Sequence, residues 1–262
     1  MTIKTRPRIY YIDAVSSENN LLNFIEPNNP PGLELTASLF VGSRSMTKLM
    51  IEVERALNDA GENVYTVTFD RSTRIVTISA DDTFELLVSS GSNVGVSPFS
   101  LLGFTGSDRT GASSYVGDTA IGNNYVPQFL PQQYTSFDDN LEGTESSLNE
   151  SAAGVVEVVT FGETRFMEMN LTFITDIFKG KANPINNNQS AIQETRNLME
   201  FLIRKSEVEI MLDKDDVNTF DNALLESTKK SRQGTSYQLN ELVGRGLNDH
   251  YETGVLKFRK VN

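Results

Sequence analysis

The spacing of apolar residues switches between two periods along the chain, and this ordering constrains the fold more than any other feature. Apolar and polar side chains alternate over 33–41, the pattern of a strand with one buried face. The spacing then becomes helical over 46–60, with Ser45 as N-cap and Gly61 where a left-handed C-cap is expected. Strand-like runs follow. This order favours an α+β module with an antiparallel sheet over a doubly wound parallel fold.

The runs after the helix predict a hairpin, a third strand and a buried turn. Residues 65–69 and 75–78 alternate on either side of a polar turn, which is a hairpin signal. Residues 83–88 form a separate strand candidate, and 98–104 a short buried helical turn. We therefore predict an N-terminal α+β module over 1–105.

Residues 106–153 are rich in Gly, Ser, Asp and Asn and have no clear periodicity. A stretch of this length is uncommon inside a compact domain and indicates an arm, a linker or disorder. Five aromatic residues argue against a solvated linker: Tyr115, Tyr125, Phe129, Tyr134 and Phe137. We predict an arm or long loop whose aromatics are buried, either against its own domain or against a neighbouring subunit.

A second module is predicted over 154–262, again with strands around one helix. The helix begins at Ser190, with Gln193 at capping-box spacing and an apolar stripe of Ile192, Leu198, Met199 and Leu202. The predicted strands are 155–161, 167–173, 207–212 with one charged face, a strand at Tyr237 and Leu239, and 254–261. The last strand carries Leu256 and Phe258 on one face, and Lys257, Arg259 and Lys260 on its polar face or edge.

Composition excludes several classes of protein. With 35 acidic and 23 basic residues the formal net charge is −12, which argues against a protein whose main partner is a nucleic acid. The chain has no Cys, so disulfides, thiolate metal sites and a cysteine nucleophile are excluded, and the single histidine, His250, excludes a multi-histidine metal site. No apolar run reaches bilayer length and no signal peptide is evident, so synthesis in the cytoplasm is expected. The sequons at Asn149, Asn170 and Asn188 are then chance matches.

No motif in the chain carries chemistry. Neither a phosphate loop nor a dinucleotide fingerprint is present. The acidic run 213–218 has Asn218 where a calcium loop has glycine and Leu224 where it has the bidentate Glu, so it is interpreted as an acidic turn. His250 is interpreted as a solvated loop residue, and the basic cluster 229–232 as a solvated face or the positive half of an interface. We predict no catalytic, cofactor-binding or metal-binding residue, and no enzymatic activity.

The second half of the chain resembles a group of tailed-bacteriophage tail proteins that share the tail-tube-like fold. This group includes tube, distal-tail and baseplate-hub proteins. The resemblance lies in the order of a helix at 191–202, a strand at 208–212, a strand at 236–239 and a closing strand at 251–261. The first half is similar to a module of phage virion proteins through 64–74 and 100–105.

This resemblance implies a β-sandwich or barrel with a flanking helix, assembled as a hexameric ring whose sheet edges are covered by neighbours. It also implies an acidic lumen that repels passing DNA. The expected function is that of a structural virion protein at the distal tail or baseplate hub. Its expected partners are its own copies and other tail or baseplate proteins, and DNA passes through without specific binding. No membrane and no cofactor is expected.

Three alternatives stay open. The chain could be the repeating tail-tube subunit or the tail terminator, although the N-terminal module and the arm favour the distal end. From another class, it could be a receptor- or carbohydrate-binding module in which the Gly/Ser-rich arm supplies recognition loops. An acidic hydrolase with paired carboxylates is the third.

Overall fold

The computed structural model describes ten ranges of the chain: 6–28, 32–129, 146–150, 156–160, 166–176, 190–204, 206–212, 219–228, 239–242 and 249–261. Two compact units are present. The N-terminal unit is Ile9–Asn124 with Ser206–Glu209, and the C-terminal unit is Met1–Arg8, Tyr125–Lys205 and Ile210–Asn262. The predicted α+β class, mainly antiparallel β, is confirmed.

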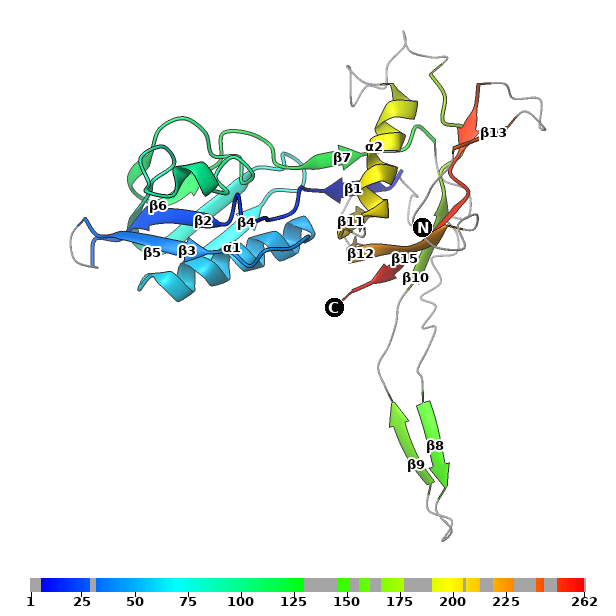
Figure 1. Ribbon diagram of the computed structural model, residues 1–262, viewed down its shortest axis with the longest axis horizontal. Coiled ribbons are helices and arrows are strands. Elements are labelled where there is room, and N and C mark those ends of the chain that lie inside the picture. Colours follow the sequence, from blue (N-terminus) through cyan, green and yellow to red (C-terminus); the bar gives the residue numbers. More distant parts are fainter. Residues whose placement is uncertain are drawn as a thin grey trace, which may run out of the picture. The chain divides into compact units, whose positions relative to one another are not determined.

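The N-terminal unit is an antiparallel sheet with one long helix (Figure 1). Its strand order is β3-β2-β5-β4, and β6 pairs with β5. The bounds are β2 (Leu21–Ile25), β3 (Glu34–Ser38), α1 (Met46–Ala60), β4 (Tyr65–Phe69), β5 (Val76–Leu86), the 3₁₀ turn η1 (Val94–Val96) and β6 (Arg109–Val116). Side chains from the helix and the strands form one core, in which Phe24, Tyr65, Phe84 and Tyr115 make successive edge-to-face pairs.

Helix α1 begins as predicted, because the Ser45 side chain accepts a hydrogen bond from Lys48 N. The predicted left-handed cap at Gly61 is wrong: its φ of −109° and ψ of 179° are extended. The glycine is required there for space, because a Cβ would overlap the carboxylate of the buried Glu26.

Two further predictions for this unit are corrected. The runs 75–78 and 83–88 belong to one strand, β5, because β6 pairs with both of its ends across two register shifts. The unit also extends past the predicted boundary at 105 to Asn124, since β6 lies within the stretch interpreted as an arm. The segment 98–104 is a buried turn as predicted, with Phe99, Leu102 and Phe104 in the core.

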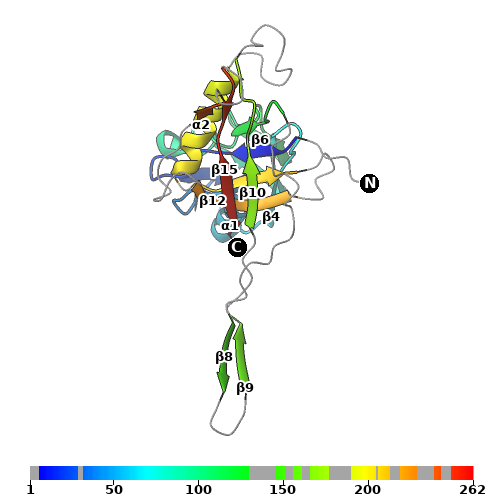
Figure 2. The ribbon, with the colours of Figure 1, turned by 90° about the vertical axis from the view of Figure 1, so that its right-hand side faces the viewer.

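The C-terminal unit contains strands in the order β10-β15-β12-β11, in which β15 is antiparallel to both β10 and β12 (Figure 2), and two separate two-stranded sheets. The order continues as β11-β1-β7, and the chain passes from one unit to the other within β1, β7 and β11. The bounds are β1 (Arg8–Tyr11), β7 (Asn123–Tyr125), β8 (Ser146–Glu150), β9 (Val156–Thr160), β10 (Phe166–Asn170), α2 (Ala191–Ile203), β11 (Val208–Met211), β12 (Thr219–Thr228), β13 (Asn240–Glu241), β14 (Tyr251–Glu252) and β15 (Val255–Lys260).

The helix and last strand of this unit follow the sequence pattern closely. Ser190 accepts a hydrogen bond from Gln193 N, but the Gln193 side chain donates to Asn197 instead of closing the capping box. Leu198, Met199 and Leu202 are buried, whereas Ile192 is half-buried. In β15, Leu256 and Phe258 are buried, as predicted.

Three strand predictions in this half are corrected. β12, which pairs with β15, was not predicted, because its residues were interpreted as part of an insertion. β10 ends at Asn170 and does not extend to the predicted end at 173, where Phe173 has a φ of +57° that lies outside the β region. Of the strand predicted at Tyr237 and Leu239, Leu239 is not in a strand but directly precedes β13 (Asn240–Glu241).

Several sequence predictions lie outside the described residues. These are the acidic run 213–218, the basic cluster 229–232, the sequon at Asn188, and the aromatic residues Tyr134, Phe137 and Tyr237.

Candidate assembly surfaces

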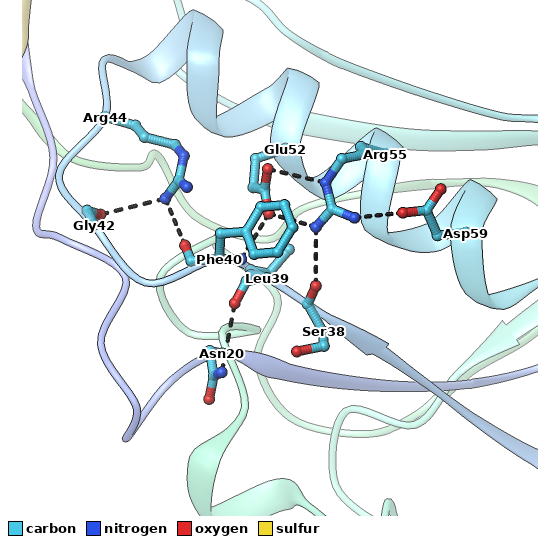
Figure 3. A network of polar contacts seen from close by, with 9 residues as sticks. All are labelled: Asn20, Ser38, Leu39, Phe40, Gly42, Arg44, Glu52, Arg55 and Asp59. Carbon is cyan, nitrogen blue, oxygen red and sulfur yellow. Dashed lines mark hydrogen bonds and ion pairs between the residues drawn. The ribbon is translucent and has the colours of Figure 1, made fainter.

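Side chains of α1 occupy hydrogen-bonding groups on the outer edge of β3. The guanidinium of Arg55 donates from Nη2 to the Ser38 carbonyl oxygen at 3.0 Å. The Glu52 carboxylate accepts from Phe40 N at 2.7 Å, just beyond the end of the strand (Figure 3). An unpaired strand edge is a template for pairing with another chain, so these contacts close this end of β3.

The same helix closes the outer edge of β4. The side-chain amide of Asn58 donates to the Tyr65 carbonyl and accepts from Tyr65 N, at 3.1 and 2.8 Å. One turn earlier, Glu54 accepts from Val67 N at 2.9 Å. The edge strand β6 is protected differently, because Gly111 has a φ of +77° and the β5–β6 register shifts twice. The N-terminal unit therefore offers little regular edge to a partner strand.

The outer edge of β10 differs from all of these. β10 stands at the end of its sheet and pairs with β15 in unbroken register over all five residues (Figure 2). Within the described ranges, no side chain or strand bonds to its other edge. At and just past its end, Asn170 Oδ1 and Thr172 Oγ1 are buried and accept no hydrogen bond from any described group. Such an edge is suited to accept a strand from another chain.

The polar face of this sheet carries an aromatic residue between cations. The Lys257 Nζ lies 4.0 Å from the centroid of the Phe166 ring, and the Arg259 guanidinium lies 5.4 Å from it. Glu226 is 3.8 Å from both cations. Lys257 and Arg259 thus lie on the polar face, as predicted for this strand, but β15 is not an edge because β10 and β12 flank it.

The strands β8 and β9 form a hairpin that pairs with no other described strand (Figure 1). Its five cross-strand pairs include Leu148 opposite Val158, and valine occupies three of them. A two-stranded hairpin is marginally stable in water on its own. Contacts beyond the pairing that the structure describes are therefore expected to stabilise it.

Of the five aromatics predicted to be buried, Tyr115 and Tyr125 are buried within their own chain. The Tyr115 hydroxyl donates to the Phe84 carbonyl at 2.6 Å, and the Tyr125 and Thr195 hydroxyls are 2.9 Å apart. For these two residues the own-domain alternative is correct. Phe129 remains 46% exposed and makes an edge-to-face contact with Phe173.

Three exposed apolar residues of this unit, Phe40, Val41 and Ile51, are together called the apolar patch; Phe40 and Val41 lie where the chain passes from β3 to α1, and Ile51 lies on α1. Their exposed fractions are 62%, 60% and 62%. The Arg55 guanidinium stacks on the Phe40 ring at 4.1 Å from its centroid and is held by Glu52 and Asp59 (Figure 3). Alternation predicted a buried Val41, but β3 ends at Ser38, so Val41 lies outside the sheet.

The ion pair beneath this patch makes stability depend on pH. Burial of Glu52 opposes its ionisation, but the hydrogen bonds from Arg55 and Phe40 N outweigh burial and lower the pKa of its carboxyl. A lowered pKa means that the stabilisation is complete above the pKa of the unfolded chain and is lost as pH falls through the folded value. We expect the free energy of unfolding, followed by urea denaturation from pH 7 down to pH 3, to fall less steeply in Glu52→Gln than in the native chain. Equal slopes would contradict this role.

Two carboxylates are fully buried in the N-terminal unit. Glu26 accepts from Glu62 N, Asn63 N and the Tyr65 hydroxyl. Glu209 pairs with Arg71 Nε at 2.5 Å and accepts from the Thr47 hydroxyl at 2.9 Å. The sequence predicted one charged face for the strand at 207–212, and Glu209 on that face is fully buried because the 206–209 segment packs into this unit. Both carboxylates are fully used in holding backbone and side chains in place, which explains their burial without a chemical role.

No catalytic, cofactor or metal residue was predicted, and no grouping of ligands suited to a metal occurs among the described residues. His250 is half-buried in the connection before β14, where its carbonyl accepts from Leu242 N. Neither described helix has the length and apolar character needed to cross a bilayer.

Charge is divided unequally between the two units. The N-terminal unit has 16 acidic and 6 basic residues, a net charge of −10, whereas the C-terminal unit has 19 acidic and 17 basic residues, a net charge of −2.

The chain matches no protein-family model and no curated protein at a significant level.

Proposed function

We propose that the chain is a structural subunit of a tailed-phage tail that assembles with its own copies into a ring at the distal tail or baseplate hub. The phage assignment rests on the sequence resemblance at 64–74, 100–105 and 191–261. The assembly rests on one structural observation, the contrast between the capped edges of β3 and β4 and the uncapped edge of β10. A chain that protects two edges and leaves a third regular edge without a partner among its described residues has a surface suited to a neighbouring subunit.

Charge supports one refinement of this proposal. The resemblance implied an acidic wall facing DNA, and the acidic excess belongs to the N-terminal unit. The C-terminal unit, whose sequence carries the tail-tube resemblance, is close to neutral, with a net charge of −2. If a DNA-repelling surface operates in the ring, the N-terminal unit is the part with the charge to supply it.

Amide hydrogen exchange tests the proposed role of β10. We expect the outward-facing amides of Phe166–Asn170 to exchange at least ~10-fold more slowly in the assembled protein than in dilute monomer, because a partner strand would pair with them. The amides of β3 and β4 serve as internal controls and should be unchanged. Exchange in β10 that is equally fast in both samples would contradict edge pairing.

Negative-stain images separate the alternatives within the tail. Isolated rings are expected for a hub or terminator, and long polymers for the repeating tube. Specific glycan binding by the monomer would instead favour a receptor- or carbohydrate-binding module.

A further inference from the structure

The apolar patch of Phe40, Val41 and Ile51 has the features of a docking surface. Neighbouring exposed apolar residues rimmed by polar groups mark interaction sites in soluble proteins. Phe40 is also preorganised, because Arg55 stacks on its ring while Glu52 and Asp59 fix the guanidinium (Figure 3). An aromatic side chain that is already fixed in position loses little conformational entropy on binding, which favours Phe40 as a central contact for a partner. On α1, Ile51 lies one turn before Arg55, on the same exposed side of the helix.

The patch also carries a cation with unused donors. Arg44 donates from Nη1 to the carbonyls of Phe40 and Gly42, at 2.6 and 3.4 Å, and forms no ion pair with any described residue (Figure 3). Its Nε and second terminal nitrogen donate to no described residue, so a carboxylate can bind to them in the two-pronged geometry that arginine favours. Basic residues are scarce in this unit, with six against sixteen acidic ones, and three of the six are Arg44, Lys48 and Arg55.

A complementary sequence occurs in the same chain. No lysine or arginine lies between Arg109 and Arg165. Within that stretch, residues 134–142 read Tyr-Thr-Ser-Phe-Asp-Asp-Asn-Leu-Glu and combine three apolar or aromatic side chains with three carboxylates. These residues lie outside the described ranges, and their chemistry matches the patch: apolar groups for Phe40, Val41 and Ile51, and a carboxylate for Arg44.

We propose that the apolar patch binds residues 134–142 of a second copy of this chain, with Asp138 or Asp139 on Arg44 and Phe137 against Phe40 and Ile51. This inference rests on the proposed self-assembly and names one of its contacts. It is independent of β10, because the patch lies in the N-terminal unit and uses side chains instead of a strand edge.

Photo-crosslinking from position 51 tests the proposal directly. A photoreactive amino acid replaces Ile51 in the full chain, and the product is mixed with isotopically labelled native chain before irradiation. We expect crosslinks to residues 134–142 that join labelled to unlabelled chains. The same substitution at Val64, which is equally exposed in this unit, is the control and should not give them. Crosslinks confined to one chain, crosslinks to other segments, or none at all would overturn the proposal.

A charge-exchange experiment provides a second test of the proposed contact. We expect Arg44→Glu, and separately Asp138→Arg with Asp139→Arg, to weaken self-association roughly 10-fold or more, and the combination in one chain to recover most of the loss. Recovery excludes simple misfolding as the cause. If the protein assembles but neither change has an effect, this contact is wrong while the proposed function stands. A native chain that stays monomeric under all conditions overturns both.

Discussion

Replacement of Glu209 by Ala is expected to destabilise the N-terminal unit by about 3 kcal/mol, the lower end of the usual cost of removing one partner from a buried ion pair, because the Arg71 side chain is 27% exposed. The Glu209 side chain is fully buried, and its loss leaves the Arg71 guanidinium and the Thr47 hydroxyl without this acceptor. Urea denaturation, followed by circular dichroism at pH 7, measures the change. Glu209→Gln keeps the shape and the bond to Thr47 but loses the charge, so its loss of stability should be intermediate.

Glu207 is the matched control for this prediction, because it lies two residues earlier in the same segment. Its carboxylate bonds to Lys48 Nζ and Ser45 N, both at 3.3 Å, and its side chain is 15% exposed, whereas the Glu209 side chain is fully buried. A pair of that kind contributes at most about 1 kcal/mol. If Glu207→Ala were as damaging as Glu209→Ala, the effect would come from disturbing the 206–209 segment and not from the buried charge.

Replacement of Gly61 by Ala is expected to cost about 2–3 kcal/mol, even though alanine is the better helix former next to α1. The added methyl group would overlap the Glu26 carboxylate and come within 3.1 Å of the Phe24 ring. Glu26 cannot move away freely, because Glu62 N, Asn63 N and the Tyr65 hydroxyl all donate to it. Thermal and urea unfolding both report the loss.

The control for Gly61 is Gly95→Ala, where an added Cβ meets nothing within 4 Å and the backbone is not left-handed. That change should leave stability unaltered or raise it slightly, because alanine restricts the unfolded chain. A left-handed cap at Gly61 would have predicted a smaller cost, arising from backbone strain alone. A cost for Gly61→Ala no larger than that for Gly95→Ala would contradict the packing explanation.

Local patterns in the sequence predicted the elements whose stabilisation is local. Ser45 and Ser190 cap the two helices as predicted, and the β4–β5 hairpin follows from alternation on either side of a polar turn. Each of these depends on residues close together in the chain. Sequence periodicity reports such contacts well.

Features that depend on distant partners were missed. Glu209 was predicted only as part of a charged strand face, and its burial could not be predicted because its partners Arg71 and Thr47 lie more than a hundred residues away. β12 was overlooked because Thr219–Thr228 lacks a clean alternation and gains its place by pairing with β15. The capping of β3 and β4 by α1 also escaped prediction, since Glu52, Glu54, Arg55 and Asn58 have the spacing of an ordinary solvated helix face.

The mass of the native particle in solution, determined by native mass spectrometry over a range of protein concentrations, tests self-assembly most directly. The subunit is 29.1 kDa, and a closed ring is expected to give one dominant species at an integral multiple of that mass, six for the stoichiometry implied by the tail-tube resemblance. A species of 29.1 kDa at every concentration and ionic strength would contradict it.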